Sequence, residues 1–331
     1  MPPRRLTSVR RLLALSTATL MVSFLSGCGL GTAGGFAPTG QLAGPIEDVD
    51  QMDGATIAVG SKNFTEQILL GKIAVILLKS AGADVSDLTN IPGSSSARQA
   101  QLEGQVDIEW EYTGTAWISY LGHEKGIPDK DEQYEAVRKE DLEKNNLVWL
   151  PPAPMNNTYG FAVTSETAKK LNVSKLSDLQ KLPKSERTFC VESEFANRND
   201  GFEPMLKTYD IPLGQEVPRG NVKTLATGAI YAATDRGECN FGEIFTTDGR
   251  IKALDLTVLA DDRNFFPAYN VCLVVRQELL DQYPGIEDLF GPVSQKLTDE
   301  VLIELNARID VDGREPVDVA YEWLTQEGFL D

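Results

Sequence analysis

The chain has 331 residues, of which 42% are hydrophobic, and its formal net charge at pH 7 is -18. This apolar fraction is enough to build a core in each of two domains of ordinary size. The charge excludes nucleic-acid binding as a function class, because so acidic a surface repels phosphate groups; the same charge serves solubility without any further function.

The N-terminus has the three regions of a secretory signal. Four arginines at positions 4, 5, 10 and 11 precede the apolar run "LLALSTATLMVSFL", which is followed by "LSGC" ending at Cys28. The run is too short to span a bilayer comfortably. "LSGC" resembles the bacterial lipobox, which implies that residues 1–27 are removed and that Cys28 is lipidated. The mature protein is then expected outside the cytoplasm, anchored to the bacterial cell membrane. The alternative is that Cys28 is an ordinary thiol within a signal peptide.

The segment 28–53 is expected to be a flexible tether. Its sequence "GLGTAGGFAPTGQLAGP" is rich in glycine, alanine and proline and has no hydrophobic periodicity.

Strands and helices alternate from residue 55 onward. A buried strand is predicted over 55–62, followed by a helix from 65 that Gly82 closes and a second helix over 94–104. The serines that open this second helix cap it or leave its N–H groups free for an anion. A strand over 105–115 runs into a polar loop, and its alternating Asp107, Glu109 and Glu111 are expected on one solvated face. A charged surface helix follows over 131–146.

A second set of strands and helices begins at residue 159 and extends to 276, and two helices over 298–310 and 316–328 end the chain. This alternation predicts an α/β fold with two mostly parallel sheets, helices on both faces and a ligand cleft between two lobes.

Three cysteines follow the lipobox: Cys190, Cys239 and Cys272. Disulfides persist in exported proteins, and the simplest arrangement is one pair with one thiol left over. Cys190 and Cys239 lie in strand-like runs separated by a helical stretch, which is typical of adjacent parallel strands. Their pairing is a hypothesis, because spacing alone does not settle the connectivity.

Catalysis is not predicted. The chain has a single histidine, His123, in a glycine-flanked loop, so neither a zinc site nor a serine–histidine triad is expected. The sequence contains no G-x-S-x-G elbow and no phosphate-binding G-x-x-x-x-G-K-[ST] loop. No enzyme activity, metal or cofactor is therefore expected.

Six segments in register carry a family resemblance. They resemble the signature segments of the substrate-binding proteins of osmoprotectant ABC transporters, which take up glycine betaine, proline betaine, carnitine, choline and related quaternary amines: "VGSKNFTEQ", "EYTGT", "NNTYGFAV", "EFANRNDG", "FTTDGRIKALDL" and "DDRNFFPAYNVCLVVR". The resemblance implies a type II periplasmic-binding-protein fold, with lobe 1 at 54–157 plus 264–331 and lobe 2 at 158–263, joined by a two-strand hinge. It also implies a monomer that works with a membrane permease and its ATPase.

The resemblance further implies an aromatic cage. A trimethylammonium group has no N–H to donate, so a site must hold it on the negative faces of aromatic rings, each worth about 0.5 to 2 kcal/mol. The cage positions fall on Tyr112, Tyr159, Phe245 and Tyr269; Phe245 departs from the tyrosine of the family pattern. Replacing Tyr112 by leucine is expected to weaken binding with little change in the stability of the free protein.

The anionic end of the ligand would meet Lys62, Thr115 and Arg198 by the same resemblance, with Asn157 beside the second ring. A guanidinium fork suits a carboxylate, so betaine-like ligands are favoured over choline. The alternatives are a binding protein for another small solute, such as an amino acid or a polyamine, and an exported hydrolase.

Overall fold

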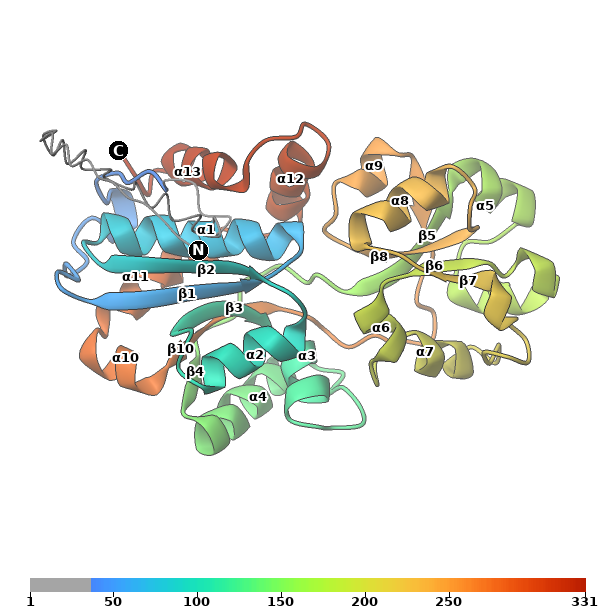
Figure 1. Ribbon diagram of the computed structural model, residues 1–331, viewed down its shortest axis with the longest axis horizontal. Helices are drawn as coiled ribbons and strands as arrows, with labels where there is room; N and C mark the ends of the chain where they lie inside the picture. Colours follow the sequence, from blue (N-terminus) through green and yellow to red (C-terminus); the bar gives the residue numbers. More distant parts are fainter. Residues whose placement is uncertain (1–36) are drawn as a thin grey trace, which may run out of the picture. The chain divides into compact units, whose positions relative to one another are not determined.

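The computed structural model of the protein describes residues 37–331, in which two five-stranded sheets, each flanked by helices, form two lobes (Figure 1). The expected signal peptide, residues 1–27, and Cys28 lie outside the described residues. None of the described helices is long and apolar enough to cross a membrane.

Lobe 1 is built on a sheet with the strand order β2-β1-β3-β10-β4. Its strands are β1 (Thr56–Lys62), β2 (Asp84–Ile91), β3 (Ile108–Tyr112), β4 (Leu147–Trp149) and β10 (Val271–Arg276). Its helices are α1 (Thr65–Ser80), α2 (Ser94–Leu102), α3 (Thr113–Thr115), α4 (Lys130–Asn145), α10 (Gln277–Gln282), α11 (Gly285–Ser294), α12 (Asp299–Asp310) and α13 (Pro316–Gln326). A short π-helical turn, Ala116–Tyr120, follows α3.

Lobe 2 is built on a sheet with the strand order β7-β6-β8-β5-β9. Its strands are β5 (Tyr159–Thr164), β6 (Phe189–Val191), β7 (Val222–Thr224), β8 (Phe241–Phe245) and β9 (Leu256–Val258). Its helices are α5 (Ser165–Leu171), α6 (Ser193–Asn197), α7 (Phe202–Thr208), α8 (Thr227–Asp235) and α9 (Arg250–Ala253).

Both sheets are mixed, which corrects the expectation of mostly parallel sheets. In lobe 1, β1 pairs in parallel with β2 and β3, whereas β10 is antiparallel to β3 and β4. In lobe 2, β6 is parallel to β7 and β8, whereas β5 is antiparallel to β8 and β9. The reason is that the chain crosses between the lobes twice. β5 and β10 each begin just after a crossing, at the side of the sheet where β8 and β3 end, so each runs antiparallel to that neighbour.

The two crossing segments, at 155–158 and 260–270, are joined to each other. A β-bridge links Asn156 to Asn270, and the N–H of Tyr269 donates to Oδ1 of Asn156 at 2.7 Å. The N–H of Asn157 also donates to the carbonyl of Tyr269 at 3.3 Å. Asn157 and Tyr269 are therefore held next to each other at the hinge.

The segment 37–53 packs on lobe 1, so the expected tether does not extend to residue 53. Leu42 forms a β-bridge with Leu330, the N–H of Ala43 donates to the carbonyl of Phe329 at 2.9 Å, and Ile46 and Met52 are buried in the lobe 1 core. A few apolar side chains among glycines and prolines make these contacts, and the glycine- and proline-rich composition of the segment did not predict them.

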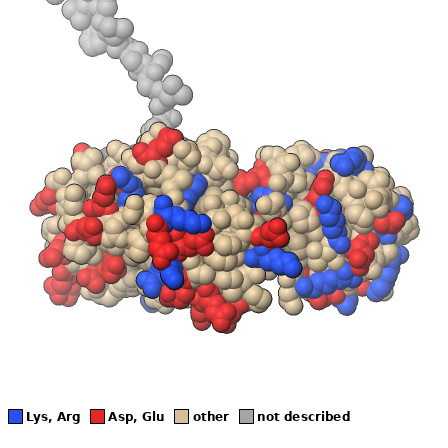
Figure 2. Space-filling view, turned by 90° about the horizontal axis from the view of Figure 1, so that it is seen from below, with Lys and Arg blue, Asp and Glu red and all other residues tan. Residues whose placement is uncertain are grey.

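The acidic residues of β3 do not form the expected solvated face. Glu109 and Glu111 are each only 1% exposed, while Asp107 is partly buried and forms an ion pair with Arg276 at 3.1 Å. The reason is that β3 lies in the centre of its sheet, between β1 and β10. The excess acid lies mostly on the surface of lobe 1, and on the face in Figure 2 basic side chains are more frequent over lobe 2.

A disulfide joins Cys190 in β6 to Cys239 just before β8, with the Cα atoms 5.8 Å apart. The two strands are parallel neighbours in the sheet, as the spacing of the cysteines indicates. Cys272 of β10 is an unbonded, buried thiol.

Candidate ligand-binding site

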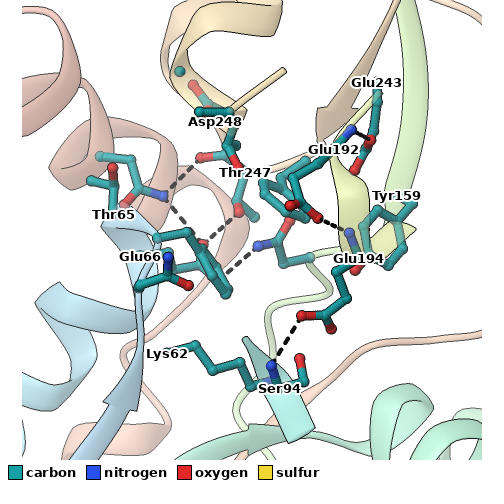
Figure 3. Close-up of a pocket in the computed structure, with 18 of the residues that line it drawn as sticks. Lys62, Thr65, Glu66, Ser94, Tyr159, Glu192, Glu194, Glu243, Thr247 and Asp248 are labelled. Carbon is teal, nitrogen blue, oxygen red and sulfur yellow. Dashed lines mark hydrogen bonds between the residues drawn. The ribbon is translucent and has the colours of Figure 1, made fainter. Parts of the chain in front are cut away.

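A cavity of about 620 Å³ lies between the lobes (Figure 3). The chain brings side chains to it at the ends of its elements: β1 ends at Lys62, β3 ends at Tyr112, β5 begins at Tyr159 and β8 ends at Phe245. Seven of the eight expected ligand-binding residues line the cavity: Lys62, Tyr112, Thr115, Asn157, Tyr159, Phe245 and Tyr269. The eighth, Arg198, is buried behind this wall.

The aromatic rings of the wall form a connected series. Tyr159 lies 5.3 Å from Phe245 and 5.5 Å from Tyr269, between ring centroids. Phe64, the residue just before α1, stacks on Phe245 at 5.1 Å and on Tyr112 at 6.2 Å. Phe64 therefore connects the four expected rings, although the sequence analysis did not single it out. Its position two residues after Lys62, within "VGSKNFTEQ", was the available signal.

Tyr112 is fixed by a buried carboxylate that the sequence analysis also missed. Glu66, in the first turn of α1, accepts hydrogen bonds at Oε1 from the Tyr112 hydroxyl at 2.7 Å and from Asn157 Nδ2 at 2.9 Å. At Oε2 it accepts from Asn306 Nδ2 at 3.2 Å and from the Thr247 hydroxyl. Burial raises the pKa of Glu66, and these hydrogen bonds oppose that rise.

The four partners of Glu66 come from different parts of the fold. Tyr112 ends β3, Asn157 lies in the first crossing segment, Thr247 belongs to lobe 2 and Asn306 to α12. A single carboxylate thus connects an expected cage residue to the hinge and to both lobes.

Lys62 already has an anionic partner. Its Nζ lies 2.5 Å from Glu111 Oε1 and 4.9 Å from the centroid of the Tyr112 ring. Glu111 Oε2 also accepts the Tyr120 hydroxyl at 2.5 Å. Behind this pair, both carboxyl oxygens of Glu109 are buried without a hydrogen-bond partner, and burial, with the charge of Glu111, raises the pKa of Glu109 to about 8.

Arg198 does not present its guanidinium to the cavity. Its Nε and Nη2 contact the two carboxylate oxygens of Asp200 at 2.7 and 2.6 Å, and its Cζ lies 5.4 Å from the centroid of the Tyr159 ring. Asp200 also accepts the Tyr269 hydroxyl at 2.7 Å. This pair therefore supports two rings of the wall, and only a 3.4 Å contact from Nη2 to the Thr115 hydroxyl joins Arg198 to a lining residue of lobe 1.

Four carboxylates line the lobe 2 side of the cavity, and Figure 3 labels all of them: Glu192, Glu194, Glu243 and Asp248. Glu192 caps α6 by accepting the N–H groups of Glu194 and Phe195 at 2.5 and 3.3 Å. Glu194 accepts the N–H of Ser94 at 3.0 Å, across the cleft. Burial raises the pKa of Glu243 to about 8, although its carboxylate accepts the N–H of Glu192 at 2.6 Å.

The start of α2 matches neither prediction for its serines, which were that they cap the helix or that its N–H groups stay free for an anion. Its N-cap is Gly93, and no side chain caps it. A protein carboxylate, Glu194, takes the place at the Ser94 N–H that an external anion would occupy. Among residues 37–331, no group of three or more His, Cys, Asp or Glu side chains could hold a metal ion.

The sequence of residues 55–326 matches the family described as the substrate-binding domain of the ABC-type glycine betaine transport system. The chain belongs to this family. It is 38% identical over 284 residues to the glycine-betaine-binding protein of Pseudomonas aeruginosa, an alignment that covers 83% of this chain and 89% of that protein. Members of the family are solute-binding proteins of transport systems.

Solved structures agree with this assignment. The apo form of YehZ from Escherichia coli matches with a TM-score of 0.62 and 31% identity over 83% of this chain and 99% of that one. A glycine betaine/carnitine/choline ABC transporter structure matches with a TM-score of 0.68 and 28% identity over 83% of this chain and all of the other. The expected two-lobed, type II periplasmic-binding-protein fold is confirmed.

Proposed function

We propose that the cavity of this family member captures a quaternary ammonium osmoprotectant and that the loaded protein delivers it to an ABC permease and its ATPase. The observation that carries the proposal is the ring series on the cavity wall, in which Phe64 links the four expected cage residues. A methylated ammonium presents an apolar surface with a diffuse positive charge, and several ring faces can hold it together where hydrogen bonds cannot.

The charge of the wall supports the same ligand class. The lining includes six carboxylate residues and only two basic ones, Lys62 and Arg250. Such a wall stabilises a cation and attracts it from solution. The names of the similar proteins, which include glycine betaine, carnitine and choline, point to the same class. We propose binding without catalysis.

Matched pairs of ligands test the proposal. Calorimetric titration of the purified protein would compare choline with ethanolamine and glycine betaine with glycine, because each pair differs only in the methyl groups on nitrogen. The methylated member of at least one pair should bind at least about tenfold more tightly, a difference of about 1.4 kcal/mol. Equal binding within both pairs would refute a cage for quaternary ammonium and would favour an amino acid or polyamine site.

The location is a second part of the proposal. We infer that residues 1–27 are a lipoprotein signal peptide and that Cys28 anchors a monomeric protein to the outer face of the cytoplasmic membrane. Two observations support this inference. The "LSGC" sequence lies at the expected distance from the basic N-terminus, and substrate-binding proteins of ABC importers bind their ligands outside the cytoplasm.

A further inference from the structure

We infer that the cavity selects a net-cationic quaternary ammonium compound that carries a hydroxyl group, such as choline, over a zwitterionic betaine. This inference rests on the proposed function, because it concerns the rest of a ligand whose trimethylammonium group the rings hold. It reverses the preference that the arginine at position 198 suggested in the sequence.

The two cations expected to bind a ligand carboxylate are already neutralised. Arg198 makes a two-point contact with Asp200, through Nε and Nη2, which is the geometry that a ligand carboxylate would need. Lys62 is paired with the buried Glu111 at 2.5 Å. A betaine carboxylate would have to displace a protein carboxylate from either cation, and the displaced charge would stay buried without its partner.

The other basic residue of the wall, Arg250, is likewise paired with protein carboxylates. Arg250 contacts Asp248 through Nε at 2.9 Å, and its Nη2 lies 3.2 Å from Asp310. Both of these acids line the cavity with it. The described lining therefore contains no basic side chain without a carboxylate partner.

Backbone N–H groups at the starts of α2 and α6 are also occupied, whereas the starts of α1 and α8, which line the cavity as well, have no side-chain cap. The N–H of Ser94 at the start of α2 donates to Glu194, and the first N–H groups of α6 donate to Glu192. Both acceptors are carboxylates of lobe 2 that line the cavity. The protein thus supplies its own anions at the starts of α2 and α6, where free N–H groups would otherwise stabilise a ligand anion.

The unsatisfied polar atoms point to a ligand that donates a hydrogen bond. Oδ1 of Asn157 and Oδ1 of Asn306 are buried without a partner, and both residues line the cavity. The amide orientation of Asn306 is fixed, because its Nδ2 also donates at 3.0 Å to the carbonyl of Thr247, which can only accept. Nδ2 of Asn157 donates to Glu66 Oε1 at 2.9 Å, which leaves Oδ1 of Asn157 as the free acceptor. The buried side-chain donors that lack a partner in residues 37–331 include those of Arg98, Trp110, Ser294 and Trp323, none of which lines the cavity.

A hydroxyl-bearing cation fits this wall better than a betaine. The hydroxyl can donate to a buried amide oxygen. A carboxylate only accepts; it could take the Tyr159 hydroxyl as a donor, but it would find no basic side chain of the lining without a carboxylate partner. Tetramethylammonium has the positive charge without the donor, so it separates the contribution of charge from that of the hydroxyl.

Titration calorimetry of the purified protein with choline, tetramethylammonium and glycine betaine tests the inference. Choline should bind at least about tenfold more tightly than glycine betaine and several-fold more tightly than tetramethylammonium. Glycine betaine binding as tightly as choline would overturn the preference for a net cation. Tetramethylammonium binding as tightly as choline would overturn the role of the hydroxyl. If none of the three binds, the proposed function itself fails.

Asp200→Asn provides the matched variant test. The amide keeps the size of the side chain but removes the charge that neutralises Arg198, so the preference for choline over glycine betaine should narrow at least about fivefold. Asp235→Asn makes the same change on the exposed end of α8 and should leave the preference unchanged. A preference that is equal in both variants would overturn the claim that the pairing of Arg198 disfavours the zwitterion.

Discussion

Replacing Tyr112 by phenylalanine removes one hydroxyl group and keeps the aromatic ring. In the structure this hydroxyl donates to Oε1 of Glu66 at 2.7 Å, and the Tyr112 side chain is almost fully buried. Tyr112 thus has two functions, as a ring of the proposed cage and as a donor to a buried carboxylate. The expectation that Tyr112→Leu would hardly affect the free protein therefore changes, because leucine removes that donor as well.

The magnitude follows from the kind of hydrogen bond. A hydrogen bond to a charged group contributes roughly 1.5 to 3 kcal/mol, and leaving the acceptor buried with fewer donors adds to the loss. We expect Tyr112→Phe to lower the free energy of unfolding by about 2 kcal/mol at a pH where the Glu66 carboxylate is ionised. Binding of a quaternary amine should change much less, because the ring face is retained.

Tyr159→Phe is the matched control. Tyr159 also lines the cavity and contacts other rings, but its hydroxyl makes no hydrogen bond within the described part of the chain. Its loss should change the free energy of unfolding by less than about 0.5 kcal/mol. Urea unfolding of both variants and the unaltered protein, without ligand, measures the difference.

The pH dependence gives a sharper test. The Tyr112 hydrogen bond stabilises the ionised form of Glu66, so its contribution is present where the carboxylate is charged and is lost as pH falls through the pKa of the folded state. The difference in the free energy of unfolding between Tyr112→Phe and the unaltered protein should therefore become smaller as the pH is lowered. Equal destabilisation by the two phenylalanine variants, or a gap that does not vary with pH, would refute this reasoning.

Three further predictions concern other parts of the chain. Burial raises the pKa of Glu109 to about 8, so its stabilising contribution is complete below about pH 4.5 and is lost as pH rises through about 8. Glu109→Gln should match the unaltered protein in Tm at pH 5 and exceed it at pH 9; parallel curves would contradict this. A non-reducing peptide map should join Cys190 to Cys239, and Cys190→Ser should cost about 2 to 4 kcal/mol in unfolding free energy; three free thiols in exported protein would disprove the pairing. Cys28→Ala should release the protein from the membrane fraction or leave it unprocessed, whereas normal processing and anchoring would rule out lipidation at that residue.

The elements most visible in the sequence were those with local signals. The helix from residue 65 was predicted from its periodicity and from Gly82, and in the structure α1 ends at Ser80 with Gly82 at a φ of 93°. The expected ring positions could be placed by family segments, and the cavity lining includes all four of them. Periodicity and short motifs are local properties, so a single sequence carries them well.

The partners of those residues could not be predicted in the same way. Alternating acids on β3 indicate a solvated face, but the strand becomes central only when β10 arrives from far along the chain. Arg198 looks free for a ligand in the sequence, and only the fold brings Tyr269 and Tyr159 against its pair with Asp200. These contacts depend on tertiary packing, which overrides local patterns.

The position of β10 has a consequence for how the protein folds. This strand lies between β3 and β4 in the lobe 1 sheet, yet it is the last of the ten strands to be synthesised. Every strand of lobe 2 lies between residues 159 and 258, so that sheet is complete in the chain before β10. Pairing β3 with β10 closes a loop of more than a hundred residues, so it is slow and entropically costly. Lobe 2, the second lobe to be synthesised, is therefore expected to fold first. Lobe 1, which begins the chain, stays incomplete until Val271–Arg276 is inserted, and the cavity forms only at that last step.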